Sequence, residues 1–91
     1  MDFTIEQNRI YKQDEHGKLI AELIFPDRND DTVAITRTYV DATLRGQGIA
    51  DKLMQALMAE LKAQSKQAKA ICSYAVKWFE NHPEYNNLLK N

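Results

Sequence analysis

The chain of 91 residues has little of several features that mark particular classes of protein. It has one cysteine, Cys72, which rules out an internal disulfide and favours a reducing compartment. No apolar run approaches the roughly 18 residues that cross a bilayer. The N-terminus also lacks the basic and apolar blocks of a signal peptide. These absences predict a cytoplasmic protein that does not enter a membrane.

The chain also lacks an excess of either charge. Twelve Lys and Arg face thirteen Asp and Glu, which gives a formal net charge of −1. Because a nucleic-acid backbone is held by positive potential, we do not expect nucleic acid as a partner. His16 and His82 have no partner at metal-ligand spacing, so we predict no metal site and expect both to be exposed. The length fits one domain over residues 1–91, and a monomer is the working assumption.

The first forty residues have the composition of β-strands. Val, Ile, Thr and Tyr are frequent there, and Asp14–Gly17 has the chemistry of a hairpin turn. A second polar turn is expected at residues 27–31, and an irregularity near Gln7-Asn8. The expected strands cover residues 3–12, 18–25 and 32–40.

The rest of the chain predicts helices separated by one strand. From residue 46 to 64 the apolar side chains recur at three- and four-residue steps, as on a helix with one buried face. Residues 68–72 are short and apolar, like a strand, and residues 74–80 fit a second helix with Ser73 as its N-cap and Pro83 beyond its end. The apolar face of the long helix comprises Ile49, Ala50, Leu53, Met54, Leu57, Met58 and Leu61.

This order of elements predicts an α+β fold. A strand, a helix and a strand in succession place the two strands parallel, whereas the first three strands can pair as an antiparallel meander. We therefore expect a mixed, mostly antiparallel β-sheet with one long helix and a short C-terminal helix.

A glycine-containing loop, Arg45-Gly46-Gln47-Gly48-Ile49-Ala50, lies where the long helix begins. Free backbone N–H groups and the helix dipole favour an anion at such a place, and Arg45 adds a guanidinium. Two glycines also simply permit a tight turn into a helix, so the residues alone leave both interpretations open. The loop lacks the Gly-Lys-Ser/Thr ending of a P-loop and the third glycine of a dinucleotide-binding fingerprint.

The loop resembles the acetyl-CoA diphosphate motif of the GNAT N-acetyltransferases, Arg/Gln-x-x-Gly-x-Gly/Ala. Arg45, Gly48 and Ala50 occupy its three specified positions. A subgroup of very small GNAT-like proteins is similar over most of residues 18–90. The segments that carry this resemblance are Thr38-Tyr39-Val40, the loop itself, Cys72-Ser73-Tyr74, Asn81-x-Pro83 and Leu88-Leu89.

The resemblance implies a minimal GNAT-like fold with acetyl-CoA as cosubstrate. In such folds the strand before the loop splays from its neighbour, and its backbone edge pairs with pantetheine. Tyr39 and Val40 would supply that edge here. The residues that the resemblance assigns to the cosubstrate are Tyr39, Val40, Arg45, Gly46, Gln47, Gly48, Ile49 and Ala50.

Two residues are candidates for chemistry. Cys72 lies near the start of the second helix, where the dipole favours a thiolate, and the small relatives place a cysteine near the cosubstrate thiol. Tyr74 is placed to protonate the departing coenzyme A thiolate, a role of tyrosine in many GNAT enzymes. Each also fits a purely structural role, Cys72 as an inert buried residue and Tyr74 as a core residue with a tethered hydroxyl. Some relatives have a histidine where this chain has Arg37, and we expect Glu22 to face solvent rather than act as a base.

Two functions fit these observations. The first is an acetyl-CoA-dependent N-acetyltransferase in which an unidentified amine attacks the thioester directly, with an acetyl-Cys72 intermediate as a variant. The second is a non-catalytic acyl-CoA-binding or protein-interaction module. The second is favoured by the absence of the helical insertion that usually builds the GNAT acceptor site between the first two strands.

Overall fold

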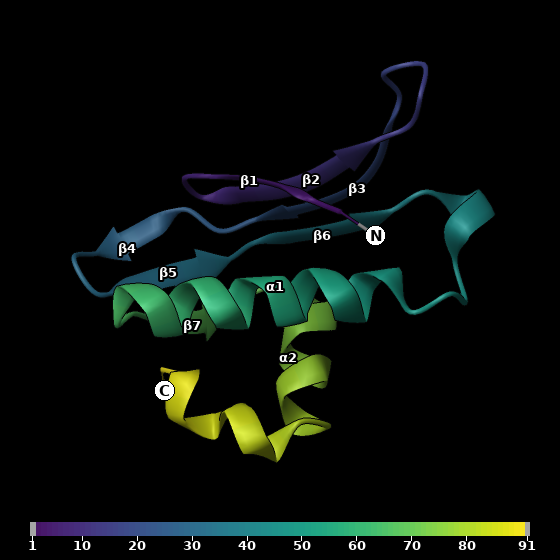
Figure 1. Cartoon of the computed structure of the whole chain (residues 1–91). Helices are drawn as coiled ribbons and strands as arrows, with labels where there is room; N and C mark the ends of the chain where they lie inside the picture. Colours follow the sequence, from purple (N-terminus) through teal and green to yellow (C-terminus); the bar gives the residue numbers. More distant parts are fainter. Residues whose placement is uncertain (1, 91) are drawn as a thin grey trace.

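The computed structural model describes residues 2–90 and confirms the predicted α+β fold (Figure 1). Two α-helices, α1 (Ile49–Gln64) and α2 (Ser73–Glu80), are accompanied by two 3-10 helices, η1 (Ala42–Leu44) and η2 (Pro83–Leu88). The strands are β1 (Thr4–Glu6), β2 (Arg9–Gln13), β3 (Leu19–Ile24), β4 (Asp27–Asn29), β5 (Thr32–Ile35), β6 (Arg37–Val40) and β7 (Gln67–Ala70).

The expected mixed sheet is divided into two smaller sheets. One is antiparallel with strand order β1-β2-β3-β6, and the other has the order β4-β5-β7 with β5 and β7 parallel. The strand predicted over residues 32–40 is interrupted at Thr36, so β5 joins one sheet and β6 the other. The sequence of this stretch is suited to strand throughout, and the division arises from its different partners, β7 for β5 and β3 for β6. Beyond Thr36 the chain therefore pairs with β3 and no longer runs beside β7.

The N-terminal region differs from the sequence prediction in two places. The irregularity predicted near Gln7-Asn8 is a turn, and it divides the strand expected over residues 3–12 into β1 and β2, which pair with each other. Asn8 has a φ of 67°, which asparagine tolerates better than most residues, and its Nδ2 donates to the Phe25 carbonyl at 2.8 Å. The polar segment expected to be only a turn at 27–31 contains β4.

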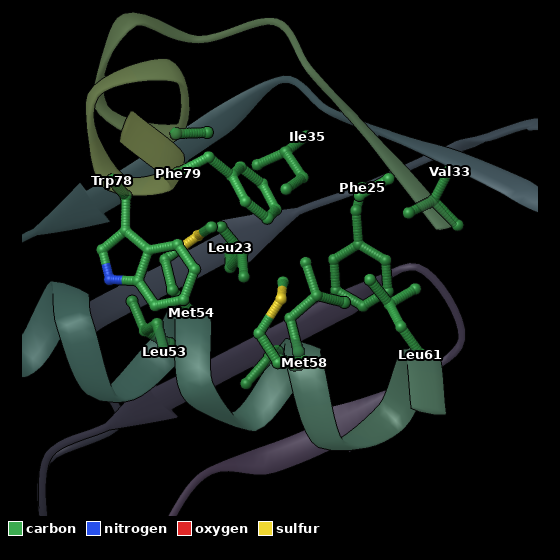
Figure 2. Packing of buried hydrophobic residues seen from close by; sticks show 14 of the residues in the cluster. Leu23, Phe25, Val33, Ile35, Leu53, Met54, Met58, Leu61, Trp78 and Phe79 are labelled. Atoms are coloured by element: carbon green, nitrogen blue, oxygen red, sulfur yellow. The ribbon is translucent and has the colours of Figure 1, made fainter. Parts of the chain in front are cut away.

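Helix α1 covers the inner faces of the strands and supplies much of the core. Its buried side chains include Met54 and Met58, as the apolar periodicity predicts. Figure 2 shows these methionines among side chains from β3, β5 and α2, with Trp78 and Phe79 reaching toward α1. The helix begins at Ile49, three residues later than expected, because Gly46 and Gly48 both have positive φ.

The C-terminal third packs α2 and η2 on the other side of α1 from β1–β3 (Figure 1). Strand β7 ends at Ala70, since the N–H groups of Ile71 and Cys72 both turn to the Ile35 carbonyl, at 3.1 and 3.0 Å. Cys72, not Ser73, is the N-cap of α2. Over the described residues, no helix is long and apolar enough to cross a membrane.

Candidate functional site

The chain leaves β6 through a turn that Asp41 holds in place. Its carboxylate accepts hydrogen bonds from the Thr43 hydroxyl and from the Thr43 backbone N–H, the latter at 3.1 Å, and Lys18 Nζ lies 3.3 Å away. The hydroxyl bond above all, then the backbone bond, lowers the pKa of Asp41 to about 2. Asp41 thereby caps η1 and fixes the direction in which the loop approaches α1.

The backbone conformation of the loop requires glycine at two positions. Gly46 and Gly48 have φ values of 84° and 76°, in the left-handed region where other residues are strained. An added Cβ at either glycine would meet nothing within 4 Å, so the loop is open on this side. Any molecule that binds here therefore has direct access to the backbone.

Free N–H groups gather where α1 begins. Gly48 is the N-cap and provides no side-chain bond, and the first bond of the helix runs from the Lys52 N–H to the Gly48 carbonyl at 3.1 Å. The N–H groups of Ile49, Ala50 and Asp51 precede that bond and have no carbonyl one turn earlier in the helix. With the helix dipole, they make this end attractive to an anion.

A pocket of about 160 Å³ lies against this loop and brings it together with α2. It contains six of the eight residues predicted to bind the cosubstrate, together with Tyr74 from α2, but not Tyr39, Gln47 or Cys72. Leu44 and Asp51 also contribute, and sequence reasoning missed both. The complete lining is Val40, Leu44, Arg45, Gly46, Gly48, Ile49, Ala50, Asp51 and Tyr74.

The free edge of β6 runs toward the same pocket. The Asp41 N–H donates to the Ile20 carbonyl at 2.9 Å, and alternation along an antiparallel strand then turns the backbone of Tyr39 toward β3. The backbone groups of Thr38 and Val40 face away from β3, and Arg45 Nε donates to the Val40 carbonyl at 3.5 Å. This alternation favours Thr38 and Val40 over Tyr39 as backbone partners for an extended ligand.

Tyr74 lines the pocket and is 37% exposed. Desolvation raises its pKa, and the nearby charges of Asp51 and Cys72 add to this effect. The hydroxyl therefore keeps its proton at neutral pH. This is the state that a proton donor to a departing thiolate requires.

Cys72 lies outside the pocket lining. It is half-buried against the core, and its Sγ is 3.4 Å from the Thr38 Oγ1 on β6. The contact joins the N-cap of α2 to the strand whose free edge leads to the pocket. This geometry links Cys72 to the strand edge rather than to the loop.

The structure corrects the predictions for two other polar side chains. Glu22 does not face solvent but is buried on the outer face of its sheet, with Arg9 at 2.7 Å and Arg37 at 3.1 Å. Desolvation acts to raise the pKa of Glu22, but the bonds from both arginines outweigh it and keep the pKa below its ordinary value. This makes Glu22 a poor base. Its partners lie on neighbouring strands, so their proximity depends on sheet register.

His82 is also less exposed than expected. It stacks on Trp78, with ring centroids 4.1 Å apart, while its Nδ1 lies 2.7 Å from the Trp78 carbonyl. Its other nitrogen, Nε2, lies 3.5 Å from Asp51 Oδ1. His16, by contrast, is exposed as predicted.

Comparison with known proteins identifies the family. The model of the GCN5-related N-acetyltransferase family matches residues 9–88, whereas no curated protein matches the chain. A GCN5-like protein of Staphylococcus aureus, solved by NMR, is 23% identical with a TM-score of 0.83, over 99% of this chain and 88% of that one. Rv2747 from Mycobacterium tuberculosis, solved with CoA, is 19% identical with a TM-score of 0.67, over 85% of this chain and 48% of that one.

A further structural neighbour is an aminoglycoside 6'-N-acetyltransferase complexed with coenzyme A. It is 18% identical with a TM-score of 0.53, and the match covers 65% of this chain and 34% of that one. This chain thus spans half or less of the length of both coenzyme A complexes but most of the small staphylococcal protein. At these identities the structures establish a shared fold. On the match of the family model to residues 9–88, the chain belongs to the GCN5-related N-acetyltransferases.

Proposed function

We propose that this protein is an acetyl-CoA-dependent N-acetyltransferase that transfers the acetyl group directly to an amine. The observation that carries the proposal is the shared pocket, in which the glycine loop at the start of α1 and the Tyr74 side chain of α2 line the same space. The family supplies the reaction class, and two structural neighbours were solved with coenzyme A.

The pocket has the donors that a diphosphate needs. The unpaired N–H groups at the start of α1, the open loop at Gly46 and Gly48, and the exposed guanidinium of Arg45 all favour an anion. A chain of amide groups such as pantetheine can bond to the backbone of Thr38 and Val40, on the free edge of β6. Together these features provide for both the charged and the extended parts of acetyl-CoA.

In the proposed reaction, the nitrogen of a neutral amine attacks the thioester carbonyl carbon. A C–N bond forms, the C–S bond breaks, and the electrons of that bond leave with sulfur. Tyr74 donates its phenolic proton to the thiolate, while the nitrogen releases its extra proton to solvent and Tyr74 is reprotonated from solvent. No covalent enzyme intermediate is required, and the separation of Cys72 from the pocket lining favours this direct route over an acetyl-Cys72 intermediate.

One observation favours a second candidate function, a non-catalytic acyl-CoA-binding module. The connections β1–β2 and β2–β3 are tight turns, and no helix of the described chain lies between these strands. The element that usually builds the acceptor site in larger relatives is therefore missing between them. An acceptor would have to be held by strand edges and α2.

Two measurements separate these functions. Calorimetry with coenzyme A measures binding, and a thiol-release assay with acetyl-CoA measures turnover with and without lysine, spermidine, kanamycin or a lysine-containing peptide. The enzyme binds coenzyme A and releases thiol faster with at least one amine. Binding without amine-stimulated release supports the module, and the absence of binding overturns both.

A further inference from the structure

Helix α2 depends on its neighbours for its position, and Trp78 is its principal anchor. The helix has only eight residues, too few to be stable alone. Trp78, the one tryptophan of the sequence, is 3% exposed and stacks with both His82 and Tyr85, with ring centroids 4.1 and 5.2 Å away. Figure 2 shows its ring extending from α2 toward α1, beside Leu53 and Met54.

The indole N–H fixes α2 to the first turn of α1. Trp78 Nε1 donates to Asp51 Oδ1 at 2.7 Å, a short bond to a charged acceptor. His82 lies against the same pair, with its Nδ1–H donating to the Trp78 carbonyl at 2.7 Å and its Nε2 3.5 Å from Asp51 Oδ1. Within residues 2–90, the side-chain hydrogen bonds and ion pairs that join α1 to residues 73–82 all end on Asp51.

Asp51 connects this anchor with the pocket. Asp51 lines the pocket beside the glycine loop. Its second carboxylate oxygen, Oδ2, accepts a hydrogen bond from Gln55 Nε2 at 2.8 Å. Tyr74 lies one helical turn before Trp78, so both residues project from the same face of α2. The bond between Trp78 and Asp51 therefore joins the helix that carries Tyr74 to the end of α1 that follows the glycine loop.

We propose that Trp78 is a positioning residue for acetyl transfer, which acts by bonding to Asp51 and so holding the Tyr74 hydroxyl at the pocket. This inference rests on the proposed function and adds a residue that neither the glycine motif nor the predicted site includes. Trp78 does not line the pocket, so it is not expected to bind coenzyme A itself. Its effect falls on the orientation of the proton donor.

The first test compares Trp78→Phe with Phe79→Leu. Trp78→Phe keeps an aromatic ring but removes the indole N–H. Phe79→Leu also makes a buried side chain smaller, but Phe79 forms no side-chain hydrogen bond. A displacement of a catalytic group by about 1 Å lowers the rate by up to about 100-fold. We therefore expect Trp78→Phe, which would displace the Tyr74 hydroxyl, to lower kcat by about 10- to 100-fold. The KM for acetyl-CoA should change less than about twofold, and Phe79→Leu should keep the wild-type kcat at a temperature where it is folded.

A double-mutant cycle with Tyr74→Phe tests the route of action. If Trp78 acts through the Tyr74 hydroxyl, Trp78→Phe should lower kcat much less in the Tyr74→Phe background than in the wild type. Multiplicative effects of the two substitutions would overturn the inference. An equal loss of kcat in Phe79→Leu would do the same, since it would reduce the effect to general loosening of α2.

A second pair of variants avoids the loss of the Trp78 ring. Asp51→Asn keeps an oxygen that accepts the indole N–H, whereas Asp51→Leu does not, and both remove the same charge from the pocket. We expect kcat to be about tenfold or more lower in Asp51→Leu than in Asp51→Asn. Equal values would contradict the proposal.

The positioning role of Trp78 and the proposed acetyltransferase function can fail independently of each other. If the wild type releases no thiol with any amine, the proposed function fails, and the Tyr74 ring resonances in NMR spectra of the free protein decide the positioning role. We expect these resonances to move in Trp78→Phe and Asp51→Leu but not in Phe79→Leu, and to move more in Asp51→Leu than in Asp51→Asn, which loses the same charge. Unmoved resonances in the first two variants would overturn the positioning role.

Discussion

Replacing Ala50 by glutamate tests the electrostatic basis of the proposed diphosphate site. Ala50 is the second residue of α1 and lines the pocket, so the new carboxylate would lie beside any anion held there. Two unit charges about 6 Å apart repel by about 1.4 kcal/mol at an effective dielectric constant of about 40. A diphosphate carries more than one charge, so we expect a loss of about 1–3 kcal/mol, or about 5- to 150-fold in affinity.

The same substitution should leave the fold intact. Glutamate is a good helix former, and a negative charge in the first turn of a helix stabilises it by about 0.3–1 kcal/mol. Repulsion from the adjacent Asp51 opposes this gain, so we expect the free energy of unfolding to change by less than about 0.5 kcal/mol. Weaker binding without lower stability is the signature of an anion site at the helix N-terminus.

Ala59→Glu is the matched control. Ala59 is exposed on the same helix, nine residues farther along, which places it about 13 Å from Ala50, beyond the Debye length of about 10 Å in 0.1 M salt. The assay is calorimetric titration with coenzyme A, alongside urea denaturation of each variant. An anion site at the start of α1 is excluded if Ala50→Glu binds coenzyme A as tightly as the wild type, or if Ala59→Glu weakens binding as much as Ala50→Glu.

Three other substitutions test separate parts of the account. Gly48→Ala should lower the free energy of unfolding in urea by about 1–2 kcal/mol, because φ at this position is 76°; unchanged stability would argue against the left-handed conformation. Tyr74→Phe should lower kcat at least tenfold, and the wild-type kcat should fall only above about pH 10, because the raised pKa keeps the phenol protonated below that; equal kcat values would exclude Tyr74 as the acid. The Asp41 carboxylate has a pKa of about 2 in the folded protein against 3.8 ordinarily, so it stabilises the fold above about pH 4 and loses this effect as the pH falls toward 2. Asp41→Asn should therefore flatten the acid limb of stability between pH 4 and 2, measured by urea denaturation, and parallel profiles would contradict this.

Local sequence patterns were sufficient to predict the elements that depend on local chemistry. The apolar spacing of α1 identified its buried face, including Met54 and Met58, because a single helix determines which side chains share a face. The glycine loop was found because positive φ favours glycine and because its spacing resembles a family motif. The α+β fold followed from the order of the elements.

Features that depend on distant partners were not predictable in the same way. Nothing in the residues around Thr36 distinguishes one long strand from two, since the division depends on β3 and β7. Glu22 was expected in solvent because its arginine partners lie 13 and 15 residues away in sequence. Asp51 resembles an ordinary acidic residue in a first helical turn, and its bond to Trp78 spans 27 residues. In each case the tertiary structure, not the local pattern, determines the environment.

Binding of the diphosphate at the glycine loop can be tested directly by an NMR titration of the ¹⁵N-labelled protein with coenzyme A. We expect saturable shifts of the backbone amide resonances of residues 46–51, which precede or begin α1, together with those of Thr38 and Val40 on β6. Saturable binding that leaves the amides of residues 46–51 unmoved, or no binding at all, would contradict the central claim that this loop holds the diphosphate.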